Sequence, residues 1–233
     1  MRTKFVLMAL LIFFTKVHAQ NLEGMSGLFF IPTADLQNDG TVSLGVNYLD
    51  KEIVSFSGYK DNAFTPFVTL TYLPFAELSL RITRLIKTEI TTQGIGDRTI
   101  SARIRIMEEE KYLPSLLIGF HDLLAVFGGE SAIHNNALYL TASKHIKFDS
   151  PKNFIGLHIG YGTDAVKANT HNFVGLFGGI NLKIFDMLEL IGEYDSERLN
   201  GAIRLTLFQH VSLLGGLLDF KSFAGGAAFN FVL

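Results

Sequence analysis

Two short clusters carry residue types that hydrolytic chemistry uses, His121-Asp122 and Ser143-Lys144-His145. A nucleophile needs a base within hydrogen-bond reach. Ser143 and His145 would face the same side of a strand, but two residues apart they lie too far along it for a direct bond. Neither cluster has a Gly-x-Ser-x-Gly elbow or a metal-type histidine spacing. The sequence therefore predicts no catalytic residue, no metal site and no cofactor.

A larger set of charged residues shares the polar face of several expected strands. One interpretation is a charged track for hydroxyls and acidic sugars, because arginine forks hold carboxylates at two points. The other is structural: opposite charges pair across an interior because an unpaired buried charge is costly. Both interpretations remain open at this stage. The residues are Arg81, Arg103, Arg105, Arg204, Glu77, Glu189, Glu193 and Asp195.

A third candidate precedes the first expected strand, where Thr33-Ala34-Asp35 follows Pro32. Proline is disfavoured in a central strand because it cannot donate to the ladder. The segment of residues 20–40 is therefore either a short inward plug, with Asp35 accepting hydrogen bonds from interior arginines, or an ordinary aspartate-containing turn.

The elements that must position these residues are strands, because apolar and polar residues alternate along the chain. In residues 99–106 every even position is isoleucine or alanine, and every odd position is threonine, serine or arginine. Residues 41–48 repeat this pattern with valine, leucine and tyrosine at the even positions. A period of two is typical of a strand with two different faces, whereas a helix would scatter these residues around its circumference.

About twelve or thirteen such strands can be counted. A soluble sandwich or lipocalin-like barrel would turn their apolar faces inward, and a membrane barrel would turn them outward. The polar faces are rich in Gly, Ser, Thr and Asn, which suits a crowded polar lumen. The candidates are residues 41–49, 53–59, 64–73, 76–86, 98–107, 114–121, 136–145, 153–162, 172–183, 187–195, 201–209 and 211–231, the last long enough for two strands.

Three further features favour the membrane barrel. Twelve strands of about 10 residues with short turns need roughly 200 residues, which the chain supplies. Tyr48, Tyr72, Tyr161 and Tyr194 fall at strand ends, where such barrels carry aromatic girdles. Residues 226–231, GAAFNF, resemble the terminal signal of outer-membrane barrels. The sequence thus predicts an all-β, antiparallel up-and-down transmembrane β-barrel of about 12 strands over residues 41–233.

The N-terminus and the composition place the protein outside the cytoplasm. Arg2 and Lys4 precede an apolar run of residues 5–14, and Val17-His18-Ala19 has the form of a cleavage site. We expect residues 1–19 to be a cleaved signal peptide, because the run is too short to span a bilayer as a helix. The 20 lysines and arginines do not exceed the 22 aspartates and glutamates, which argues against nucleic-acid binding, and the absence of cysteine excludes disulfides.

Short polar motifs recur between the strands. They are GLFFIPTAD at 27–35 with Asp39-Gly40, LPFAEL at 73–78 with Arg81, GDR at 96–98 with Arg103, YLP at 112–114 with Gly119 and Asp122, and ASK at 142–144. In type and order these motifs resemble those of the YjbH family, outer-membrane proteins associated with exopolysaccharide production and export. Members of that family are typically several times longer, and their glycine-rich stretch after the aspartate reads LLAVFGG here, at residues 123–129.

The resemblance implies a short, single-barrel form that assists export or surface attachment of exopolysaccharide without catalysis. Its expected partners are outer-membrane lipid, polysaccharide, export-machinery proteins and, during biogenesis, the barrel-assembly machinery. A structural or small-solute porin-like barrel is the alternative, and an outer-membrane hydrolase is a further one.

Overall fold

The computed structural model describes residues 20–52, 54–56, 59–86, 96–123, 136–166 and 170–233. The expected signal peptide, residues 1–19, and most of the 123–129 stretch lie outside these residues. None of the described residues forms a helix long and apolar enough to cross a membrane.

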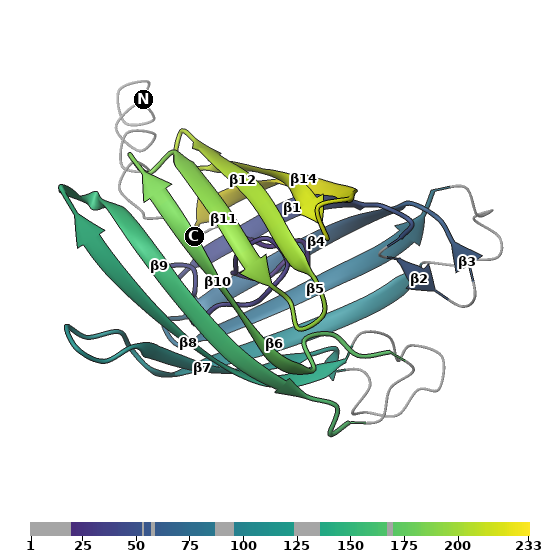
Figure 1. Ribbon diagram of the computed structural model, residues 1–233, viewed down its shortest axis with the longest axis horizontal. Coiled ribbons are helices and arrows are strands. Elements are labelled where there is room, and N and C mark those ends of the chain that lie inside the picture. The colour runs from purple at the N-terminus through teal and green to yellow at the C-terminus, as the bar shows by residue number, and fades with distance from the viewer. Residues whose placement is uncertain (1–19, 53, 57–58, 87–95, 124–135, 167–169) are drawn as a thin grey trace, which may run out of the picture.

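Twelve antiparallel strands close into a barrel (Figure 1). Each strand pairs with its neighbour in sequence, and β1 closes the ring by pairing with both β14 and β4. The predicted all-β architecture and strand number are confirmed. The barrel strands are β1 (Thr41–Leu49), β4 (Ala63–Leu73), β5 (Ala76–Leu85), β6 (Asp97–Met107), β7 (Ser115–His121), β8 (Ala137–Phe148), β9 (Ser150–Thr163), β10 (Gly175–Ile184), β11 (Leu188–Tyr194), β12 (Leu199–Leu207), β13 (Val211–Leu218) and β14 (Ser222–Val232).

One expected strand is not part of the barrel. The described residues of 53–59 contribute to a separate two-stranded sheet of β2 (Ser55–Phe56) and β3 (Tyr59–Lys60). The connection from β1 to β4 is long enough to form this small hairpin beyond the barrel end. The segment 211–231, in contrast, does split into two barrel strands.

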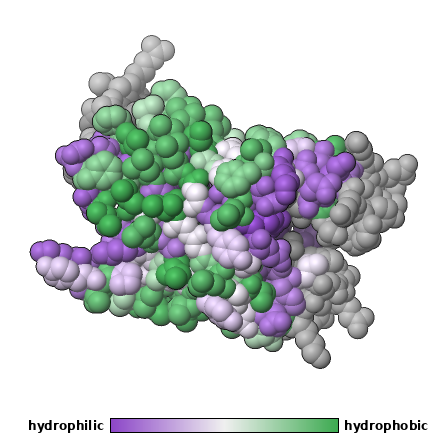
Figure 2. All heavy atoms as spheres, viewed as in Figure 1, coloured by the Kyte–Doolittle hydropathy of each residue, from purple (hydrophilic) through white to green (hydrophobic). Residues whose placement is uncertain are grey.

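Side chains alternate between the two faces of the wall as the period of two requires. On β6, Arg103 is 1% exposed and the next residue, Ile104, is 52% exposed. Figure 2 shows hydrophobic side chains gathered over the strands, with hydrophilic ones at the projecting turn between β6 and β7. A polar interior inside an apolar outer wall is the arrangement of a barrel that meets lipid. Closure of the barrel also suits a bilayer, because it leaves no unpaired sheet edge.

Residues 20–40 run inside this barrel, where the purple trace of Figure 1 lies. We call them the inner segment. Residues 20–34 are all buried. Their apolar side chains form the core of the molecule together with inward aromatic residues of the wall and of the loop before β10. The core includes Leu22, Met25, Leu28, Phe29, Phe30, Ile31, Tyr139, Phe173 and Phe177.

Two glycines allow the inner segment to approach the wall closely. Gly24 has a φ of +80°, and a Cβ there would come within 2.7 Å of the Phe67 ring. Gly179 on β10 faces Leu28, whose Cδ1 would lie 2.6 Å from an added Cβ. A side chain at Gly24 would push the inner segment away from the wall, because φ is positive there and the nearest atoms are Cγ and Cβ of Phe67.

Three tight turns place a phenylalanine at positive φ. They are Phe185-Asp186, Phe208-Gln209 and Asp219-Phe220, with φ values between 51° and 60°. Such turns match the twist of the strands they join but usually contain glycine or asparagine. The three rings are 72%, 83% and 63% exposed, respectively. They add aromatic residues to both ends of the barrel, where a lipid interface is expected.

Candidate functional site

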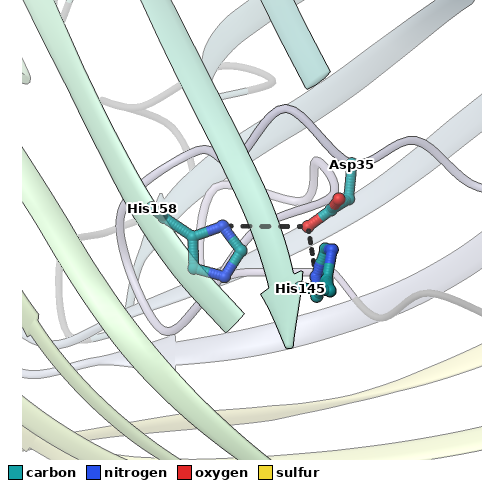
Figure 3. A group of neighbouring side chains, drawn as sticks. All are labelled: Asp35, His145 and His158. Carbon is teal, nitrogen blue, oxygen red and sulfur yellow. Dashed lines mark ion pairs between the residues drawn. The ribbon is translucent and has the colours of Figure 1, made fainter. Parts of the chain in front are cut away.

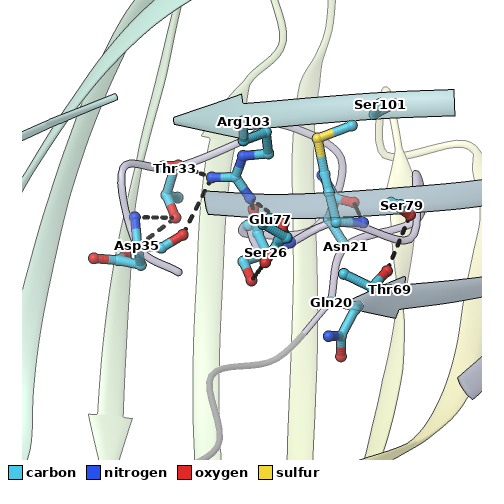
Figure 4. Close-up of polar contacts among 12 residues, drawn as sticks. Gln20, Asn21, Ser26, Thr33, Asp35, Thr69, Glu77, Ser79, Ser101 and Arg103 are labelled. Carbon is cyan, nitrogen blue, oxygen red and sulfur yellow. Dashed lines mark hydrogen bonds and ion pairs between the residues drawn. The ribbon is translucent and has the colours of Figure 1, made fainter. Parts of the chain in front are cut away.

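The polar residues of the wall gather around the inner segment, and Arg103 contacts it at several points (Figure 4). Its Nη1 donates to Glu77 Oε1 at 2.8 Å and to the Ser26 carbonyl at 2.6 Å. Its Nη2 donates to the carbonyl oxygens of Thr33 and Asp35. Glu77 in turn accepts from the backbone and hydroxyl of Ser26. One buried ion pair of the wall thus holds two stretches of the inner segment.

Arg204 on β12 repeats this arrangement on the other side of the lumen. Its Nη1 donates to Glu189 Oε2 at 2.7 Å. Its Nη2 donates to the carbonyl oxygens of Gln20, Gly27 and Leu28. In both cases the glutamate and arginine stand directly opposite each other on adjacent strands. The close pairing follows from strand register.

Arg81 on β5 pairs with the inner segment itself. Its guanidinium forms an ion pair with Glu23, which also lies 2.9 Å from His121 Nε2. Burial raises the pKa of the Glu23 carboxyl, but the charges of Arg81 and His121 outweigh burial and lower that pKa from 4.5 to about 2. This carboxylate stays ionised at neutral pH.

Glu193 on β11 binds the backbone of the inner segment. Its carboxylate accepts from the amides of Phe29, Phe30 and Ile31 at 3.0, 2.8 and 3.4 Å, and from Asn200 Nδ2 at 3.1 Å. Successive backbone amides aimed at one carboxylate form an anion-binding concavity. The carboxylate here belongs to the wall.

Two of the expected track residues lie at the barrel ends. Arg105 shares the inward phase of β6, but its Nη2 donates to the Pro74 carbonyl in the turn after β4 and lies 3.8 Å from Glu108. Asp195 follows β11 and accepts from the backbone of residues 197 and 198, which shapes that turn. Asp195 is 2% exposed and also accepts from Asn200 Nδ2, and the part of both residues in a charged track stays a prediction.

The motif of Pro32, Thr33 and Asp35 lies inside the barrel. Pro32 bridges to Gly27, which folds the inner segment back on itself. Asp35 was expected to accept from lumen arginines. Arg103 reaches its backbone oxygen, whereas its carboxylate faces His145 at 3.7 Å and His158 at 3.9 Å (Figure 3).

The residues considered for hydrolysis separate in the structure. His121 contacts Ser101 Oγ at 2.8 Å as well as Glu23. The base beside Ser143 is His158, whose Nδ1 lies 2.7 Å from Ser143 Oγ. Sequence reasoning missed this contact because His158 lies on the next strand, and only the register that pairs Ser143 with His158 brings them together. Ser143 is 1% exposed, and its Oγ accepts from the Ala34 amide at 2.8 Å.

The arrangement holds a folded segment in place and leaves little room for a ligand. A cavity of about 360 Å³, open solvent included, lies between the inner segment and β8 to β12. Asp35, His145, Lys183, Glu189 and Arg204 contribute to its lining. Within the predicted track, Arg103 and Arg204 pair with glutamates of the wall. Arg81 pairs with Glu23 of the inner segment, and Glu193 accepts hydrogen bonds from the backbone of that segment.

Comparisons with known proteins give one family and a distant structural likeness. The YjbH family, described as "Exopolysaccharide biosynthesis protein YbjH", matches residues 19–202. No curated protein matches. A solved structure described as "KdgM porin in complex with disordered oligogalacturonate" is similar at 8% identity and a TM-score of 0.45, covering 83% of this chain and 99% of that one.

Proposed function

This chain belongs to the YjbH family, and we propose that it is an outer-membrane β-barrel that helps exopolysaccharide cross or attach at the outer membrane without making or breaking bonds. The observation that carries the proposal is the family match, which includes the inner segment and the wall from β1 into β12. The apolar outer wall supports the location, because it suits lipid and not water.

The contacts of the inner segment define what such a role requires. In the described conformation the arginines and glutamates of the wall are occupied, so sugars meet no continuous charged track. Passage through the lumen therefore needs the inner segment to move. Once the segment has moved, the Ser, Thr, Asn and Arg side chains of the wall would offer many weak hydrogen bonds. Weak bonds suit a sliding polymer, because strong binding at one point would slow its release.

A non-catalytic role agrees with the surroundings of Ser143. Its hydroxyl is close to a histidine, as nucleophilic catalysis requires. However, the Ala34 amide occupies the hydroxyl oxygen and the side chain is buried. We expect Ser143→Ala to leave polysaccharide release unchanged, and the purified protein to release no product from lipid or glycan substrates.

Deletion of the gene is the direct test. We expect less extracellular polysaccharide in the deletion strain and restoration by the wild-type chain. Because the chain has no cysteine, a lock is simple to design. Ala34→Cys combined with Ser143→Cys joins the inner segment to β8, where the native amide and hydroxyl are 2.8 Å apart.

The locked double variant should restore polysaccharide only after a reductant opens the disulfide, and each single variant should restore it without reductant. Unchanged polysaccharide in the deletion strain would overturn the proposal. In that case conductance of the purified barrel in lipid bilayers would test the porin-like alternative, which predicts solute passage that the disulfide blocks.

A further inference from the structure

We propose that Asp35, His145 and His158 form a binding site for a divalent transition-metal ion, which ties the inner segment to β8 and β9. One ligand atom from each residue lies within 4.8 Å of the others. Figure 3 shows both imidazoles directed at the same carboxylate. The proposal concerns the resting barrel and is independent of the role in exopolysaccharide handling.

Two hydrogen bonds between His145 and Glu109 orient the His145 ring for metal binding. Its Nδ1 lies 2.7 Å from Glu109 Oε2, and its backbone amide donates to Glu109 Oε1 at 2.9 Å. A carboxylate can only accept, so the ring proton belongs on Nδ1. The bare Nε2 then points at Asp35 Oδ2, 3.7 Å away. A carboxylate behind the histidine that holds the metal is the usual support for such a ligand.

The side-chain amide of Asn181 orients the His158 ring in the same way. Asn181 Nδ2 donates to Glu189 Oε1 at 2.5 Å, so its Oδ1 is the atom that accepts from His158 Nε2 at 3.0 Å. This fixes the proton on Nε2 and leaves Nδ1 bare. His158 Nδ1 lies 3.9 Å from Asp35 Oδ2. The Ser143 hydroxyl now donates to this nitrogen and has to turn away when a metal binds.

The spacing fits a small ion after the three ligand atoms, which lie within 4.8 Å of one another, draw together around it. Ligand atoms bound at about 2.0–2.1 Å around a tetrahedral Zn²⁺ are about 3.3 Å apart. The two distances to Asp35, 3.7 and 3.9 Å, need to shorten by about half an ångström. The adjoining cavity has room for water at the remaining position. Two imidazoles and one carboxylate favour Zn²⁺ or Co²⁺ over Ca²⁺ or Mg²⁺, which take oxygen ligands.

The test uses tag-free full-length barrel folded in detergent, with Co²⁺ as a coloured probe and Zn²⁺ as its competitor. We expect one Co²⁺ per chain, with visible absorption bands of low coordination number that Zn²⁺ abolishes. The near-isosteric variants Asp35→Asn, His145→Gln and His158→Gln should each weaken binding at least tenfold. Glu109→Gln should weaken binding 10- to 100-fold, because it removes only the outer support of His145.

Two variants separate a metal site from a hydrogen-bond network. His210→Gln removes a histidine bonded to the Asn230 carbonyl, outside the cluster, and should leave binding unchanged. Ser143→Ala frees His158 Nδ1 and should tighten Co²⁺ binding, whereas Co²⁺ held elsewhere on the protein would bind this variant and the wild type equally. No Co²⁺ band at a stoichiometric ratio, or equal binding by all variants that fold, would overturn the proposal.

Discussion

Removing one partner of the Arg103–Glu77 pair should destabilise the barrel almost as much as removing both partners. Arg103 is 1% exposed, and its guanidinium also holds carbonyl oxygens of Ser26, Thr33 and Asp35. We predict that Arg103→Met and Glu77→Gln each lower the free energy of unfolding by about 3–5 kcal/mol, because each leaves a buried polar or charged partner uncompensated.

The double variant of Arg103→Met and Glu77→Gln shows whether the two losses of stability are additive or coupled. If the two losses were additive, it would lose about 6–10 kcal/mol. Because it leaves no unpaired charge, we expect a loss close to that of one single variant and a coupling energy of at least about 2 kcal/mol. The chain has no tryptophan, so unfolding by urea in detergent micelles is best followed by far-UV circular dichroism.

The matched control is the rim pair of Arg105 and Glu108, which are 3.8 Å apart with the glutamate side chain 80% exposed. Its coupling should be under about 1 kcal/mol, because solvent screens the two charges. Additive losses at Arg103 and Glu77, or equal coupling in the two cycles, would refute the view that buried wall charges are held by pairing.

Three further predictions test the wall, the inner segment and its ion pair. Leu80→Arg, in the middle of β5, should cost about 2–4 kcal/mol in lipid vesicles if that face meets the bilayer core, whereas Tyr112→Arg in the exposed β6–β7 turn should cost little; equal costs would contradict a lipid-facing wall. Gly24→Val should displace the inner segment and expose it to protease while the barrel remains folded, because Gly24 has a φ of +80° and an added Cβ would lie 2.7 Å from Phe67 Cγ. A protected segment would contradict this packing. Since the pKa of Glu23 is lowered from 4.5 to about 2, its contribution to the free energy of unfolding should be complete above about pH 4.5 and decline as the pH falls toward 2. Glu23→Gln should remove this part of the dependence of stability on pH. An unchanged pH profile in the variant would argue against the ion pair.

The wall could be predicted from the sequence because its alternation has a single physical cause. A strand that meets lipid on one side and a polar lumen on the other must alternate, as the exposures of Arg103 and Ile104 show. The tight turns could not be predicted in the same way, because Phe185, Phe208 and Phe220 are not typical turn residues.

The site was harder to predict, because register decides which residues meet. The inward direction of Arg103 follows from its place in the alternation, but its pairing with Glu77 depends on how β5 aligns with β6. His158 shares one face of β9 with Gly156 and Gly160, and nothing in the sequence singled it out. The run GLFFI at 27–31 is apolar without alternation, and only the closed barrel shows it to be the core of the lumen.

Two of the charged contacts would survive a movement of the inner segment. Glu77 and Arg103 are opposite each other on β5 and β6, and Glu189 and Arg204 are opposite each other on β11 and β12. Each arginine would lose hydrogen bonds to carbonyl oxygens of the segment but would keep its carboxylate. Water entering the lumen could replace those hydrogen bonds, so neither pair opposes the movement strongly.

Movement of the inner segment is therefore opposed mainly by contacts in which a charged group of the segment or the wall has its partner in the other. Glu23 belongs to the segment and Arg81 to the wall, so departure of the segment separates this ion pair. Glu193 belongs to the wall and loses three backbone amides at once, which leaves Asn200 as a remaining donor. Both carboxylates lie in a space that excludes water while the segment is present. In the proposed role, a polymer that displaces the segment would lower this cost by supplying donors to Glu193 and a carboxylate or equivalent anion to Arg81, and an acidic polysaccharide carries both groups.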